Sequence, residues 1–203
     1  MKPYIIGLTG GIASGKTAAG RVFERLGAKI IDADVVSREV VRSGSEGFGR
    51  IKELFPDCIT DGELDRARLK SIVFSDKEKL ELLNAATWEL IGREISRRIS
   101  ELSESDVAVL IVPLLFESGL WRLADAVVTV SADESLRLKR VTERDGVSEE
   151  TALSIIRSQT DENERVKRSD YVLDGNGDVT ALEKSAAELY GEITRRKIRR
   201  SDS

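Results

Sequence analysis

Short apolar runs alternate with amphipathic segments along the first part of the chain. Residues 4–9 form an apolar run that leads into glycines, which predicts a buried strand. From Lys16 the apolar positions recur at helical spacing as far as Gly27, a residue typical of helix ends. A second apolar run, 28–31, follows and ends at Asp32. Strand, helix and strand in this order predict a βαβ unit and therefore a parallel sheet.

The remaining pattern continues the alternation. Residues 35–104 predict mostly helix, with breaks near Ser43-Gly44, Pro56 and Asp61-Gly62. Further strands are predicted over 107–112, 126–130 and 171–173, and further helices over 133–145, over 148–168 and from about 179. The continuous apolar run 107–112 is typical of a strand covered on both faces. We therefore expect an α/β fold of three layers with a parallel sheet.

Composition narrows the chemistry available to this fold. The 203 residues include no histidine, which excludes a Ser-His-Asp triad, a His-ligated zinc site and catalysis by an imidazole. Any reaction must use carboxylates, lysine, arginine, hydroxyls, backbone amides or a bound metal ion. The single cysteine, Cys58, allows no disulfide within the chain and indicates a reducing compartment.

Charge and hydropathy bear on partners and location. The chain carries 32 basic and 36 acidic residues, a net charge of −4, so we expect no nucleic-acid and no membrane partner. The basic stretch 195–200 is interpreted as the end of a helix, and a nucleic-acid arm is the less favoured alternative. The first residues do not resemble a signal peptide and no run reaches 18 apolar residues, so a cytoplasmic protein is expected. The sequence indicates no oligomeric state.

Glycine spacing after the first strand predicts a phosphate-binding loop. Residues 10–17 fit the pattern G-x-x-x-x-G-K-[ST], in which glycines let successive backbone amides point toward phosphate oxygens. The helix that follows adds the positive end of its dipole. Lys16 is expected to reach the β- and γ-phosphates, and the Thr17 hydroxyl to ligate Mg²⁺. A chance glycine turn would lack the strand before it and the helix after it.

Two carboxylates follow the second strand. In a parallel sheet the carboxyl ends of neighbouring strands share one edge, so Asp32 and Asp34 are candidates to act near the γ-phosphate. A carboxylate there can order the waters of Mg²⁺ or accept a proton from an attacking hydroxyl. The alternative for one of the pair is to cap the helix that starts near Val35.

Three arginines lie at helical spacing on one face of the helix 133–145. They are Arg137, Arg140 and Arg144, and a break at Gly146 follows, after which Ser148 is expected to cap a new helix. A hinged segment with arginines suits a lid that closes over ATP and excludes water. A solvated helix face is the alternative for each arginine taken alone.

Together with the phosphate loop, the two carboxylates and the arginines, further motifs show that the chain resembles the dephospho-coenzyme A kinase family nearly from end to end. The two most specific strings are Ile31-Asp32-Ala33-Asp34 and Val112-Pro113-Leu114-Leu115-Phe116-Glu117. The remaining matches are the segments 6–17, 62–66, 73–74, 138–140 and 144–145, with Leu69 and Gln159.

The resemblance implies ATP-dependent phosphorylation of the ribose 3′-hydroxyl of dephospho-CoA, the last step of coenzyme A synthesis. Asp34 is then implied as the acid/base, with Lys16 and Arg140 stabilising the transferred phosphoryl group and Thr17 holding Mg²⁺. The residues expected to bind ATP are Gly10, Gly11, Ile12, Ala13, Ser14, Gly15, Lys16, Thr17, Arg144 and Asn176. Those expected to bind dephospho-CoA are Asp32, Asp65, Arg66, Trp88, Pro113, Leu114, Leu115 and Glu117. By the same resemblance Arg137, outside the matched positions, should matter much less to catalysis than Arg140.

The family layout divides one P-loop kinase domain, residues 1–203, into three parts. A core is expected over 1–34, 105–145 and 169–203, a helical acceptor-binding region over 35–104, and a lid over about 145–168. The alternatives are another small P-loop kinase for a nucleotide or metabolite, and a degenerate ATP-binding regulator. Two positions depart from the family pattern: Trp88-Glu89 stand where it shows His-Pro, and Gly175 stands where it shows asparagine.

Overall fold

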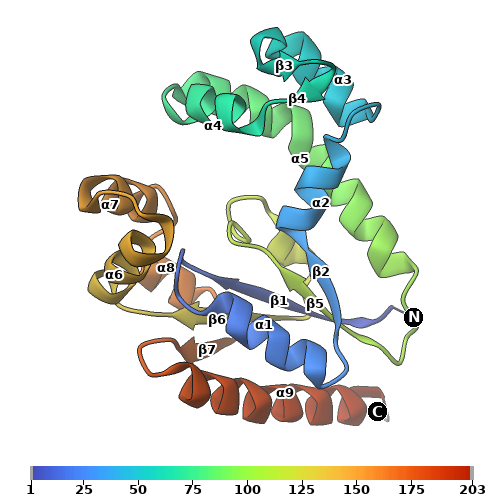
Figure 1. Cartoon of the computed structure of the whole chain (residues 1–203). Helices are drawn as coiled ribbons and strands as arrows, with labels where there is room; N and C mark the ends of the chain where they lie inside the picture. The colour runs from blue at the N-terminus through green and yellow to red at the C-terminus, as the bar shows by residue number, and fades with distance from the viewer. Residues whose placement is uncertain (1, 202–203) are drawn as a thin grey trace. The chain divides into compact units, whose positions relative to one another are not determined.

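The computed structural model describes residues 2–201 and is built on a five-stranded parallel sheet (Figure 1). The strand order is β2-β5-β1-β6-β7. The bounds are β1 Tyr4–Gly10, β2 Lys29–Asp32, β5 Val107–Ile111, β6 Ala126–Ser131 and β7 Tyr171–Asp174. Each of these strands was predicted to within one or two residues, and the α/β fold on a parallel sheet is confirmed. The chain divides into two units, 1–31 with 102–203, and 32–101.

The first unit holds its core between the sheet and two helices. Helix α1 spans Lys16–Arg25, and α9 spans Val179–Ser201; they lie side by side, with the rings of Phe23 and Tyr190 stacked 5.5 Å apart. Strand β1 is buried from Ile5 to Gly10, because neighbours pair on both edges and helices cover it. This burial explains why the central strands read as continuous apolar runs.

Three further helices of this unit follow β6: α6 Glu134–Asp145, α7 Glu149–Arg157 and α8 Glu162–Lys167. Ser148 caps α7 through a bond from the amide of Thr151, as predicted. The predicted single helix over 148–168 is wrong, because residues 158–161 separate α7 from α8. Asp161 accepts bonds from the amides of Asn163 and Glu164 and so begins a new helix. This break places residues 159 and 160 in a connecting segment.

The second unit is mostly helical, as expected for residues 35–104. The long helix α5, Lys77–Ser100, packs with α2, Ala33–Val40, α3, Glu46–Leu54, and α4, Arg66–Phe74. The sequence did not predict the small hairpin of β3, Ile59–Thr60, and β4, Glu63–Leu64, since two-residue strands leave no periodic signal. Short 3₁₀ segments complete the elements, at Pro56–Cys58 (η1) in this unit and at Leu120–Leu123 (η2) in the first unit.

The last helix is anchored near its end. The ammonium of Lys197 donates to the carbonyl oxygens of Glu104, Ser105 and Asp106 at 3.1, 2.8 and 2.9 Å. The helical interpretation of the basic stretch 195–200 is confirmed for the backbone, while the side chains of 198–200 lie outside the described part of the structure. Among residues 2–201, no helix combines the length and the apolar character that crossing a membrane requires.

Candidate active site

The predicted phosphate loop lies between the end of β1 and the start of α1. Gly15 forms the N-cap of α1 with φ at +105°, in the left-handed region that glycine adopts at little cost. The first turn of α1 contains no acidic residue, so the amides and the positive end of the helix dipole face no competing carboxylate of that turn. A glycine N-cap and a first turn without acidic residues are features that favour anion binding at a helix start.

The three arginines of α6 have different surroundings although they share one helical face. Arg137 is 5% exposed, and its Nη1 would lie 2.2 Å from a β-carbon built on Gly11. Arg140 donates from Nη1 to the carbonyl oxygen of Ala13 at 3.2 Å. Arg144 instead forms a two-pronged pair with Asp145, with both bonds at 2.7 Å. Arg137 and Arg140 are therefore the arginines of α6 that contact the phosphate loop.

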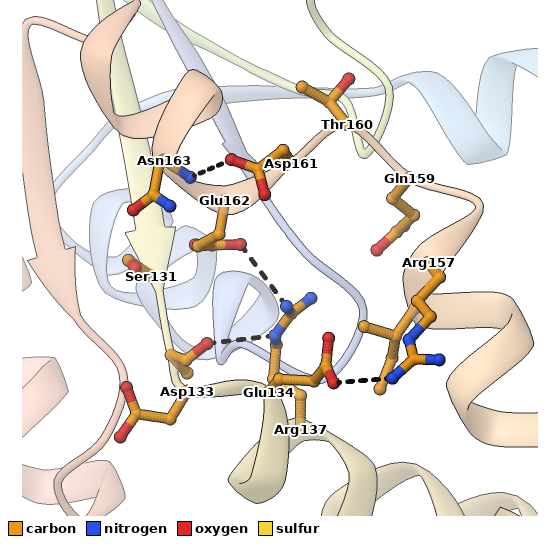
Figure 2. A pocket seen from close by; sticks show the side chains of 12 residues that line it. Ser131, Asp133, Glu134, Arg137, Arg157, Gln159, Thr160, Asp161, Glu162 and Asn163 are labelled. Carbon is orange, nitrogen blue, oxygen red and sulfur yellow. Dashed lines mark hydrogen bonds and ion pairs between the residues drawn. The ribbon is translucent and has the colours of Figure 1, made fainter.

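A polar pocket of about 460 Å³ adjoins this face of α6 (Figure 2). It lies between the start of α6 and the segment that joins α7 to α8. Its lining includes Asp133, Glu134, Arg137, Arg157, Gln159, Thr160, Asp161, Glu162 and Asn163. Arg157 pairs with Glu134 at 3.6 Å and Arg137 with Glu162 at 3.8 Å, so both arginines of the pocket lining are paired with a carboxylate.

Glu162 also belongs to a buried ion cluster. Its Oε2 accepts from Nη1 of Arg165 at 2.6 Å, and Arg165 is only 1% exposed. Arg165 also donates from Nη2 to the carbonyl oxygen of Thr160 at 2.8 Å. Because a buried guanidinium is retained only when its donors are bonded, this cluster fixes the segment before α8.

The loop after β7 lies close to the phosphate loop. Gly175 donates its amide to the carbonyl oxygen of Ser131 at 2.7 Å. A β-carbon at this position would lie 2.2 Å from the backbone oxygen of Ser14, so no larger residue fits without moving the phosphate loop. The next residue, Asn176, accepts from the amide of Asp133 at 2.8 Å. Asn176, expected to bind ATP, therefore links this loop to the start of α6.

The segment after β5, expected to bind dephospho-CoA, has an exposed and a buried side. Leu114 is 40% exposed, whereas Leu115 is fully buried and packs against Gly7 as part of the core. The carbonyl oxygen of the half-buried Pro113 accepts from the Thr9 hydroxyl at 3.3 Å. Oε1 of Glu117 accepts from the amide of Thr160 at 3.1 Å and also from its hydroxyl. Leu115 thus supports the segment from inside.

The remaining predicted residues belong to the second unit. Asp32 is the N-cap of α2 and accepts from the amide of Asp34 at 2.8 Å, so the capping alternative holds for Asp32. The side chain of Asp34 is exposed in the first turn of α2. Asp65 caps α4, and Arg66 donates to the carbonyl oxygen of Arg38 at 2.9 Å.

The residue at the first family departure also lies in this unit. Trp88 is 40% exposed on α5, so it is not a core residue. Its indole therefore has surface available for a ligand.

Metal binding would depend on few protein ligands. Among the described residues, no three or more acidic or cysteine side chains gather in a way that could hold a metal ion. The exposed hydroxyl of Thr17 at the start of α1 suits Mg²⁺, which commonly takes one or two protein ligands, substrate phosphates and water.

Several side chains at this site escaped prediction from the sequence. Gln159 was recognised as a match to the family pattern, but no role was predicted for it. In the structure its Oε1 accepts from the amide of Ile12 in the phosphate loop at 2.8 Å. Thr160, Glu162 and Arg165 were read as part of one continuous helix. The signal that could have found them is the Thr160-Asp161 pair followed by Glu164, which is typical of a helix start.

Comparison with known proteins gives the family. The family model for dephospho-CoA kinase matches residues 4–181. The chain is 42% identical over 179 residues to the dephospho-CoA kinase of Carboxydothermus hydrogenoformans, covering 86% of this chain and 87% of that protein.

Solved structures agree with this match. The dephospho-CoA kinase from Campylobacter jejuni aligns with a TM-score of 0.72 at 26% identity, over 94% of this chain and 97% of that one. TT1252 from Thermus thermophilus aligns with a TM-score of 0.82 at 33% identity, over 95% of this chain and 98% of that one. The chain therefore belongs to the dephospho-CoA kinase family, whose ATP-dependent phosphotransferase activity is the final step of coenzyme A synthesis.

Proposed function

We propose that the chain transfers the γ-phosphoryl group of ATP to the ribose 3′-hydroxyl of dephospho-CoA, with Asp34, Lys16 and Arg140 as the catalytic residues. The observation that carries the proposal is the family match over residues 4–181, which includes all three positions. Phosphoryl transfer needs little covalent chemistry from the protein, so positioned charges and water exclusion account for most of the catalysis.

The phosphate loop and α6 supply the charges. The transferred group carries negative charge on its equatorial oxygens, and Lys16 and Arg140 neutralise it in this proposal. The bond from Arg140 to the Ala13 carbonyl supports this role, because it holds the guanidinium beside the loop. Residues 145–168 act as the lid that excludes water, which would otherwise accept the phosphoryl group.

Asp34 accepts the proton of the attacking hydroxyl. Asp34 is exposed in the first turn of α2, next to Asp32, which caps that helix. A carboxylate at this position can accept a proton as the oxygen attacks phosphorus.

Mg²⁺ fits the donor set at the start of α1, where Thr17 would hold it together with phosphate oxygens of the substrate. When bound, the ion supplies positive charge that neutralises the phosphates and orients them.

The residues proposed to bind the acceptor are those that the family resemblance implies. They are Asp32, Asp65, Arg66, Trp88, Pro113, Leu114, Leu115 and Glu117. The exposed apolar surfaces of Trp88 and Leu114 support contact with the pantetheine arm. Leu115 acts indirectly by supporting Leu114, because its own side chain is buried.

The test is turnover of ATP with dephospho-CoA, compared with a panel of nucleoside monophosphates. We expect turnover with dephospho-CoA. In Asp34→Asn, kcat should fall by about 100-fold or more, with ATP affinity within a few-fold of the unmodified protein. Asp76→Asn is the matched control, because Asp76 caps α5 and asparagine caps equally well. Turnover only with a nucleoside monophosphate, or ATP binding without any turnover, would overturn the proposal. Loss of ATP binding in Asp34→Asn with an intact chemical step would overturn the role of Asp34.

A further inference from the structure

Two adjacent residues between α7 and α8 bond to two different loops of the first unit. Oε1 of Gln159 accepts from the amide of Ile12 in the phosphate loop at 2.8 Å. The amide of Thr160 donates to Oε1 of Glu117, after β5, at 3.1 Å, and its hydroxyl donates to the same oxygen. Figure 2 shows both side chains on the segment that borders the polar pocket. One peptide bond therefore joins a contact to the ATP side with a contact to the acceptor side.

We propose that Gln159 and Thr160 are positioning residues that couple the two sites, so that a nucleotide on the phosphate loop strengthens the binding of dephospho-CoA. The inference rests on the proposed function, in which the phosphate loop binds ATP and residues 113–117 border the acceptor. Neither residue needs to touch a reacting atom. Each holds a loop that contacts a substrate in the proposed function.

The segment has the support that such a link requires. The carbonyl oxygen of Thr160 accepts from the buried Arg165, which is also paired with Glu162. Asp161 begins α8 directly after Thr160. Displacing Thr160 would thus disturb a bond of a guanidinium that is 1% exposed. Because residues 159 and 160 are fixed in this way, a displacement at one of them also moves the other, whereas a flexible loop would change its conformation instead.

A second contact joins the same partners. The guanidinium of Arg168, one residue after α8, lies over the ring of Phe116, 4.1 Å from its centroid. Residues 116 and 117 are thus held at two points by the segment 160–168. We therefore expect the segment after β5 to follow a displacement of residues 159–160.

The size of the effect follows from the bonds concerned. Hydrogen bonds to a charged group are stronger than neutral ones, so the bonds of Thr160 to the Glu117 carboxylate should carry more of the coupling than the neutral bond of Gln159. Coupling between two binding sites typically changes affinity by about 5- to 150-fold. We expect a value of about 10-fold here, lost in part when either bond is removed.

The experiment measures the dissociation constant of dephospho-CoA for the full chain, without and with saturating non-hydrolysable ATP analogue. The ratio of the two constants is the coupling factor. Thr160→Val removes the hydroxyl at nearly constant shape, and Gln159→Leu removes the carboxamide. Both should bring the ratio several-fold closer to one while the affinity for the analogue alone changes less than about threefold. Thr160→Ser keeps the hydroxyl and should retain the ratio.

Thr142→Val is the matched control, because the Thr142 hydroxyl donates to two carbonyls of its own helix, those of Leu138 and Lys139. If Gln159 and Thr160 act together in one link between the two sites, the double variant Gln159→Leu/Thr160→Val should reduce the coupling factor no further than the single variant with the larger effect. Unchanged ratios in both single variants, or an equal loss in Thr142→Val, would overturn the inference. Absence of dephospho-CoA turnover in the unmodified protein would overturn the proposed function as well, whereas turnover with unaltered ratios overturns only the coupling.

Discussion

The guanidinium of Arg137 fills the space beside Gly11: its Nη1 would lie 2.2 Å from a β-carbon at that position. Gly11→Ala must therefore displace either the phosphate loop or a side chain that is 5% exposed. We expect ATP affinity to fall about 10-fold or more, as measured by calorimetry. Gly11→Ala/Arg137→Gln, with a shorter neutral side chain, should recover part of the loss. An unchanged ATP affinity in Gly11→Ala would contradict this prediction, because it would show that the displacement does not disturb ATP binding.

Substitution of Arg137 should affect stability, whereas substitution of Arg140 should affect catalysis. Arg140→Ala should lower kcat by about 10²- to 10³-fold, through loss of charge that stabilises the transition state, with little change in thermal stability. Arg137→Ala removes a buried partner of Glu162, so it should lower the free energy of unfolding by about 2 kcal/mol, while Arg165 remains to pair with Glu162. Kinetics together with urea unfolding separates the two effects. Equal loss of kcat at both positions, with unfolding unchanged, would contradict this assignment.

Trp88 offers an optical test of the acceptor site. Its indole is 40% exposed, so a ligand contact should change its fluorescence. In a Trp121→Phe background, dephospho-CoA should alter the emission more than ATP does. Trp88→Phe should raise the KM for dephospho-CoA more than the KM for ATP, because a wall contact binds only the acceptor. A drop in melting temperature with both KM values unchanged would assign Trp88 to structure alone.

Acid should weaken the second unit through Glu94. Hydrogen bonds from Arg97 and Arg98 lower the pKa of Glu94 from 4.5 to about 2. Since the folded pKa lies below the unfolded one, this stabilisation is complete above about pH 4.5 and is lost as the pH falls toward 2.

Glu94→Gln should therefore reduce the free energy of unfolding by about 1 kcal/mol at pH 7, a value lowered by solvent screening, and by much less near pH 2. Urea unfolding at several pH values measures this difference. The control is Glu81→Gln on the same helix, where the pair with Lys77 is long and exposed. A loss of unfolding free energy in Glu94→Gln that stays constant from pH 7 to 2 would contradict the pairing of Glu94 with Arg97 and Arg98.

The sequence predicts those parts of the fold whose burial is uniform. The central strands stand out because both faces are covered, and the phosphate loop stands out because its glycine spacing is fixed by backbone geometry. The hairpin at Ile59–Leu64 was missed because Asp61 and Gly62 make the turn between strands of only two residues. The break before α8 was missed because Asp161 lies inside an otherwise helical pattern.

Helical periodicity also cannot tell the arginines of α6 apart. Arg137 and Arg144 share a face, but seven residues place them about 10 Å apart along the axis. Only Arg137 is near enough to the phosphate loop to be buried against Gly11, whereas Arg144 pairs with Asp145. Spacing predicts which face a residue occupies. Which residue of that face lies beside the phosphate loop depends on the tertiary structure.

The contact between Gly175 and Ser14 limits how this chain can change over evolutionary time. With the Ser14 oxygen 2.2 Å from any β-carbon at position 175, the asparagine that the family pattern shows at this position would clash with backbone. That single substitution should be blocked until the backbone of the phosphate loop shifts, and because the contact is to a backbone oxygen, a change of side chain at position 14 does not remove it.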